Sequence, residues 1–169
     1  MTTHELISQI HYRWVAKNLH GVHSPFVYAF NEQLLAHRKQ QNPIAIDKQL
    51  DALPAKYQQL IARMQQHYAL PTLYTAATTL LPIEQPIDCL FLKKEKPGDW
   101  IRMYHTYAPH MAEQSCIIVA GIHTTARHSA KWKRLHNNPS IKLSIDLFGI
   151  GILFKRNELK DKYHYVLQY

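Results

Sequence analysis

The 169-residue chain has few of the residues that mark metal sites, disulfide frameworks or phosphate-binding loops. Its only two cysteines, Cys89 and Cys116, each lie inside an apolar run, which indicates reduced core thiols rather than a disulfide or a metal site. Its five glycines form no glycine-rich phosphate loop. Neither a nucleophile elbow nor a His-Glu-x-x-His sequence is present. The sequence therefore carries no common signature of a nucleotide loop or a metalloprotease.

Long hydrophobic runs are also absent. No apolar run approaches the roughly 18 residues needed to cross a bilayer. The first residues, Met-Thr-Thr-His-Glu, lack the basic and then apolar layout of a signal peptide. We therefore expect no membrane contact and a cytoplasmic location. Hydrophobic residues make up 46% of the chain, and its length suits one domain, so we expect a single domain over residues 1–169.

Acidic residues are scarce, because 12 Asp and Glu stand against 20 Lys and Arg, for a formal net charge of +8. Such an excess of positive charge suits an anionic partner such as nucleic acid. The basic residues are scattered, however, and their densest groups lie in residues 93–96, 131–134 and 155–162. We favour a generally solvated basic surface and keep a nucleic-acid-binding module as an alternative.

The first 70 residues carry helical patterns. Within residues 5–18, apolar side chains recur at the spacing of one helix face, which is typical of a helix packed on a core. They are Leu6, Ile7, Ile10, Trp14 and Val15. Most aromatic residues elsewhere fall on similar faces, so we interpret the aromatic set as packing residues rather than as a base-stacking platform. That set is Trp14, Trp100, Trp132, Tyr57, Tyr68, Tyr104 and Tyr107.

Further helices are marked by their ends. Gly21 is placed to stop the first helix, and Ser24 followed by Pro25 supplies an N-cap and a first-turn proline for a second. We expect these two helices to form a hairpin. A third helix should begin at Pro54, and Pro71 closes its segment.

Residues 71–169 change to short β-rich runs that alternate with helical runs. The expected strands are residues 72–77, 87–92, 115–121, 141–148 and 150–154. The alternation predicts a parallel sheet with right-handed crossovers, in which Asp99 caps one helix and Thr124 or Thr125 the next. The connection between the last two strands is too short for a crossover, so they should pair as an antiparallel hairpin. Residues 163–169 should add a final edge strand.

Two stretches of the sequence are distinctive. Residues 12–27 contain, in a row, His20, Gly21, Val22, His23, Ser24, Pro25 and Phe26. Residues 132–155 contain, in a row, Ile145, Asp146, Leu147, Phe148, Gly149, Ile150 and Gly151. Both stretches resemble a bacterial branch of the class I S-adenosylmethionine-dependent methyltransferases, and residues 145–154 are similar to the terminal hairpin of that family. The resemblance implies an α/β fold of the truncated Rossmann-like methyltransferase type. In such a fold we expect N-terminal helices and a mostly parallel sheet that ends in a C-terminal antiparallel hairpin.

The residues that bind the cofactor in this family are not matched. Where members place an acidic residue and a glycine-rich turn, this chain has Tyr74, Ala76 and Leu80. Only residues 81–86 stand where two strands and a helix would build the ribose wall. Lys93 replaces an aspartate after the next strand, and Ala120-Gly121 replaces an acidic pair. We therefore expect that the chain binds no cofactor. If these positions are misinterpreted, the expected cofactor is S-adenosylmethionine.

Two of the twelve histidines are candidate ligand contacts. His123 and His128 follow a predicted central strand, on the side where open α/β sheets bind ligands. The sequence around them contains no carboxylate and several basic residues, which disfavours a bound cation or a protonated imidazole. We assign the pair a ligand contact, and assign no catalytic or metal site anywhere in the chain. His20 and His23 should cap or hydrogen-bond the turn between the first two helices.

The missing strands also change the sheet. The resemblance implies the order third, second, first, fourth, fifth, seventh, sixth, and loss of the second and third strands leaves the first at an edge, open to pairing. Either the N-terminal helices cover this edge or two copies join through it, and we favour an isologous homodimer. The function hypothesis is a catalytically inactive methyltransferase-like protein that binds itself or a protein partner. The alternatives are a methyltransferase with an atypical cofactor site and a basic nucleic-acid-binding module.

Overall fold

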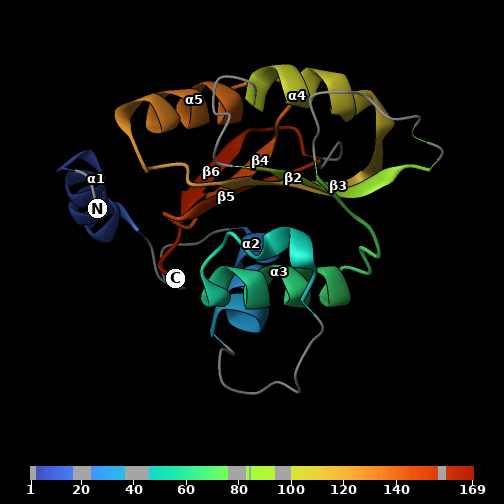
Figure 1. The fold of residues 1–169 in the computed structure, drawn as a ribbon, viewed down its shortest axis with the longest axis horizontal. Coiled ribbons are helices and arrows are strands. Elements are labelled where there is room, and N and C mark those ends of the chain that lie inside the picture. The colour runs from blue at the N-terminus through green and yellow to red at the C-terminus, as the bar shows by residue number, and fades with distance from the viewer. Residues whose placement is uncertain are drawn as a thin grey trace.

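A computed structural model describes most of the chain. The described residues are 3–16, 24–36, 46–75, 83, 85–93, 100–155 and 159–169. A six-stranded sheet lies between two layers of helices (Figure 1). Helices α4 (Trp100–Tyr107) and α5 (Ala126–His136) cover one face, and α2 (Pro25–Phe30) and α3 (Ala55–His67) cover the other, while α1 (Thr3–Val15) stands at one side. The predicted α/β class is confirmed.

The strands follow the predicted order. Their bounds are β1 (Leu73–Thr75), β2 (Ile87–Leu92), β3 (Met111–Ala120), β4 (Leu143–Asp146), β5 (Ile150–Phe154) and β6 (Tyr163–Val166). The sheet runs β1-β2-β3-β5-β4-β6, with β1, β2 and β3 parallel, β5 antiparallel to both β3 and β4, and β6 parallel to β4. The terminal hairpin and the final edge strand are therefore confirmed. β3 begins earlier than expected and β4 is shorter.

The second helix begins as its sequence predicts. Ser24 is the N-cap of α2 and its hydroxyl accepts a hydrogen bond from the Val27 amide, with Pro25 in the first turn. Phe26 packs against the rings of Tyr68 and Phe154. The helix continues as the π-helical stretch η2 (Asn31–Ala36). The other members of the distinctive string, His20, Gly21 and His23, lie outside the described residues.

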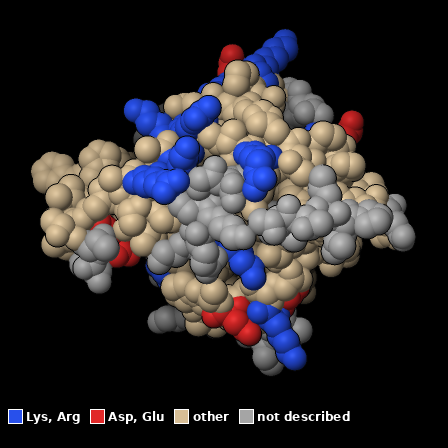
Figure 2. Space-filling view, turned by 45° about the horizontal axis from the view of Figure 1, so that its top comes forward, with Lys and Arg blue, Asp and Glu red and all other residues tan. Residues whose placement is uncertain are grey.

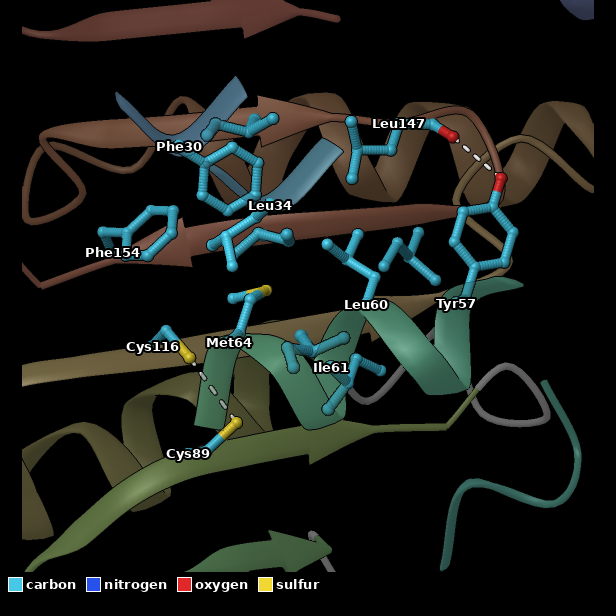
Figure 3. Packing of buried hydrophobic residues seen from close by; sticks show 14 of the residues in the cluster. Phe30, Leu34, Tyr57, Leu60, Ile61, Met64, Cys89, Cys116, Leu147 and Phe154 are labelled. Carbon is cyan, nitrogen blue, oxygen red and sulfur yellow. Dashed lines mark hydrogen bonds between the residues drawn. The ribbon is translucent and has the colours of Figure 1, made fainter. Parts of the chain in front are cut away.

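Alternate side chains of the strands enter two hydrophobic cores, one on each face of the sheet. The lower core is built from β2, β3, β4, β5, α2, η2 and α3 (Figure 3). There, Tyr57 of α3 donates a hydrogen bond to the Leu147 carbonyl at 2.9 Å and accepts one from the Gly149 amide at 3.0 Å. The second core lies beneath α4 and α5, where Trp100 and Trp132 are almost fully buried.

The two cysteines lie side by side at the centre of the sheet, as predicted. Cys89 of β2 is paired with Cys116 of β3, and their Sγ atoms are 3.5 Å apart as free thiols (Figure 3). The hydrogen bond with Cys116, burial and neighbouring negative charge hold the pKa of Cys89 well above its usual range. A thiol with a raised pKa carries little of the reactive thiolate, so Cys89 serves as a packing group. Cys116 is fully buried beside it.

Helix α1 is oriented opposite to the expectation. Its polar stripe faces the body, because His4 Nε2 lies 3.1 Å from Ser129 Oγ and the Tyr12 hydroxyl donates to the Leu167 carbonyl. Its apolar stripe faces outward. The exposed side chains include Leu6 (45%), Ile7 (62%), Ile10 (54%) and Trp14 (86%).

Two predictions for this region are therefore wrong. The apolar stripe of α1 does not enter a core, and Trp14 is not a packing residue, although Trp100, Trp132, Tyr57, Tyr104 and Tyr107 are buried as predicted. Helices α1 and α2 do not form a hairpin either, because α2 packs below the sheet beside α3 while α1 lies at its side (Figure 1).

Strand β1 lies at one edge of the sheet, as expected, and the short helix before it in the chain partly covers this edge. Gln49, in the short helix η3 (Lys48–Leu50), donates its side-chain amide to the Leu73 carbonyl and accepts a hydrogen bond from the Thr75 hydroxyl. Leu73 itself is 9% exposed. The edge is thus short and partly satisfied, which weakens it as a pairing site. None of the helices in the described part of the chain has both the length and the apolar character needed to cross a membrane.

Candidate functional site

A small cavity opens at the carboxyl ends of the parallel strands, where open α/β sheets bind ligands. Its volume is about 290 Å³, and Phe91, Lys93, Ala120 and Gly121 from the ends of β2 and β3 line it, together with Glu5 of α1. Pockets for drug-sized ligands span roughly 300–1,000 Å³. The cavity is therefore at the small end of the range for ligand pockets.

The positions that depart from the methyltransferase pattern lie partly in this cavity. Lys93 follows β2, and its carbonyl accepts a hydrogen bond from Trp100 Nε1 at 3.0 Å. Tyr74 of β1 instead turns to the α4 side, where its ring centroid is 5.5 Å from that of Tyr107. Burial, and then the neighbouring Tyr107, raise the pKa of Tyr74. Ala76 and Leu80 lie outside the described residues.

His123 has a carboxylate partner, contrary to the sequence interpretation. Its Nε2 lies 2.7 Å from Oδ2 of Asp146, although the two residues are 23 positions apart. β3 and β4 run in the same direction because each is antiparallel to β5, so the residues at their carboxyl ends meet at one edge of the sheet. The strand order alone would have brought this pair together.

Asp146 is a buried acceptor with three donors. Trp132 Nε1 donates to its Oδ2 at 3.0 Å, and the Phe148 amide donates to its Oδ1 at 2.9 Å. The side chain is 4% exposed. Phe148 has a φ of 66°, in the left-handed region that a non-glycine residue rarely adopts, and the bond from its amide to Asp146 helps to hold the β4–β5 turn in that shape.

Ser129 completes a chain of hydrogen bonds that starts at Asp146. Asp146 Oδ2 offers only acceptor sites when ionised, so the His123 nitrogen facing it, Nε2, carries the hydrogen. The other ring nitrogen, Nδ1, is then an acceptor in the neutral ring, and it lies 3.0 Å from Ser129 Oγ. His4 of α1 approaches the same hydroxyl from its other side, at 3.1 Å. A buried carboxylate, an imidazole and a hydroxyl are therefore joined in line.

The second predicted histidine takes part in a different contact. His128 lies in the first turn of α5, where Thr125 is the N-cap and accepts a hydrogen bond from the His128 amide. Its Nδ1 lies 2.6 Å from the Thr125 hydroxyl, and its ring packs edge-on against Trp100. His128 thus helps to fix the start of α5, and it does not share a partner with His123 in these contacts.

A stacked histidine pair was not singled out from the sequence. The rings of His136 in α5 and His164 in β6 have centroids 4.0 Å apart and an interplanar angle of 4°. Burial lowers the pKa of both rings, and brings that of His136 to about 4. Ser144 Oγ lies 2.8 Å from His164 Nδ1. Neutral stacked rings of this kind join α5 to the last strand and act as packing groups at neutral pH.

The described part of the chain contains no group of three or more His, Cys, Asp or Glu side chains placed to hold a metal ion. On the face shown in Figure 2, the basic side chains of the described residues stand in several groups. The interpretation as a generally solvated basic surface stays a prediction. In comparisons with known proteins, no protein-family model matches the chain and no curated protein matches it significantly.

Proposed function

We propose that this chain is a methyltransferase-like protein that has lost methyl transfer and acts in the cytoplasm by self-association, as a homodimer. The observation that carries the proposal is the outward apolar face of α1, in which Leu6, Ile7, Ile10 and Trp14 are each 45% exposed or more. An apolar group on the surface that is continuous over several residues is typical of an interaction site.

The composition of this face favours a second copy of the same helix as its occupant. Leu6, Ile10 and Trp14 are spaced four residues apart, so they form one row along α1. The row is symmetric about Ile10. Two copies related by a two-fold axis at Ile10 run antiparallel and place each Leu6 against the partner's Trp14, as an isologous interface requires.

Loss of methyl transfer is supported by the residues at the strand ends. The described ends of β1, β2 and β3 supply Thr75, Lys93, Ala120 and Gly121, and none of these is acidic. A carboxylate at such a position is what holds the ribose hydroxyls in dinucleotide-type sites. The positive charge of Lys93 disfavours a cofactor whose sulfonium is also positive. The small volume of the cavity disfavours a ligand as large as this cofactor.

We expect no measurable binding of S-adenosylmethionine or of its demethylated product. The reason is that the described ends of β1, β2 and β3 carry no carboxylate and that the cavity beside them is at the small end of the range for ligand pockets. Titration calorimetry at high protein concentration measures this directly. A dissociation constant in the micromolar range would contradict the loss of the cofactor site and would favour an atypical methyltransferase.

Replacing Ile10 with glutamate should weaken the dimer by about 100-fold or more, because each two-fold contact would then bury two carboxylates in an apolar interface. Light scattering over a concentration series measures the dissociation constant, and circular dichroism checks that the helical signal is retained. Tyr28→Glu is the matched control, since Tyr28 is an exposed apolar residue (43%) on another helix. If the Ile10→Glu protein dimerises as well as the parent, the interface lies elsewhere.

A further inference from the structure

We propose that Ser129 is an activated nucleophile that accepts acyl groups from carboxylic esters, with His123 as its general base and Asp146 as the group that holds the base. This activity concerns acyl transfer and does not depend on the self-association proposed above. It rests on the line of hydrogen bonds from the buried carboxylate through the imidazole to the hydroxyl.

The geometry supplies the three roles that such a unit needs. The base lies within hydrogen-bond reach of the nucleophile, at 3.0 Å, and the carboxylate lies 2.7 Å from the far nitrogen of the base. Because Asp146 fixes the hydrogen of His123 on Nε2, the Nδ1 lone pair faces the Ser129 hydroxyl. The ring is held in this plane by Phe148, whose centroid is 5.7 Å away in a stacked arrangement.

The N-terminal end of α5 favours the negative charge that develops on oxygen atoms at Ser129 during the reaction. Ser129 lies in the first turn of α5, an eleven-residue helix whose N-terminal amides carry a partial positive charge. The side chain of His123 is 20% exposed, so the base meets solvent.

The reaction proceeds in two balanced steps. Ser129 Oγ forms a bond to the ester carbonyl carbon as its proton moves to His123 Nδ1, and the intermediate then expels the ester's alcohol oxygen, which takes that proton and leaves as the alcohol. Water next attacks the acyl-serine and gives a proton to the same nitrogen. Collapse of this second intermediate releases the carboxylic acid, and the proton returns to Ser129.

A fluorophosphonate probe tests the nucleophile directly, because it forms a bond between phosphorus and an activated serine oxygen with loss of fluoride. We expect one label per chain, at Ser129, found by intact mass and peptide mapping. Ser129→Ala should abolish labelling, whereas Ser140→Ala, which changes an exposed serine, should leave it unchanged. p-Nitrophenyl acetate should give a burst of p-nitrophenol and an acetyl group on Ser129.

The base is tested by substitution. His123→Gln should slow labelling by about 100-fold or more at neutral pH, with an unchanged circular dichroism spectrum. Absence of labelling at Ser129 in the folded parent protein, or equal labelling of Ser129 and Ser140, would overturn the proposal. Labelling of the His123→Gln protein at the rate of the parent would overturn the role of His123.

Discussion

Replacing Asp146 with alanine should lower the free energy of unfolding by about 3–5 kcal/mol. The carboxylate accepts hydrogen bonds from Trp132 Nε1 and from the Phe148 amide, and pairs with His123, all in a site where it is 4% exposed. Its removal leaves donors without acceptors beneath α5 and releases the β4–β5 turn. Urea unfolding followed by circular dichroism measures the loss.

Two variants control for this effect. Asp146→Asn keeps the shape and one carbonyl oxygen, so it should destabilise the protein less than alanine does. Asp161→Ala removes an exposed carboxylate from a loop and should change stability by no more than about 0.5 kcal/mol. A loss below about 1 kcal/mol for Asp146→Ala would mean that water replaces the carboxylate and that the site is not dry.

Replacing Gly151 with alanine should lower the free energy of unfolding by about 3 kcal/mol, at the upper end of the range for overpacked cores. A Cβ atom at Gly151 in β5 would lie 2.5 Å from the ring of Trp132. That ring is 2% exposed and is held by its bond to Asp146, so it has little freedom to move. Either the indole is displaced or the centre of the sheet shifts.

A double-mutant cycle isolates this contact. In a Trp132→Leu background, the alanine at position 151 no longer meets the indole, so most of its cost should disappear. Thermal or urea unfolding of the four proteins gives the coupling energy. Equal destabilisation by Gly151→Ala in both backgrounds would show that the backbone of β5, rather than the indole, requires glycine.

The sheet could be predicted because its evidence is local. Alternating β-rich and helical runs gave the parallel pairs of β1, β2 and β3, and the short link between residues 148 and 150 permitted only an antiparallel hairpin. The resemblance placed these strands in order. The cysteines followed, since Cys89 and Cys116 occupy inward positions on neighbouring strands.

The orientation of α1 could not be obtained in the same way. A stripe of Leu6, Ile10 and Trp14 shows which side chains share a helix face, but it does not show on which side of that face the body lies. The inward contacts of α1 are made by polar residues, His4 and Tyr12, whose partners are more than 120 residues away. The partner of His123 could have been predicted, because the expected strand order already placed the carboxyl ends of residues 115–121 and 141–148 at one edge of the sheet. It was missed because a carboxylate was sought only near His123 in the sequence.

The polar docking of α1 has a consequence for how firmly this helix is held to the body. The bonds from His4 to Ser129 and from Tyr12 to the Leu167 carbonyl each replace a bond to water and contribute only about 0.5–1.5 kcal/mol. Since its apolar stripe points outward, α1 adds little to the hydrophobic core, and local opening of this helix should cost less free energy than opening of the sheet.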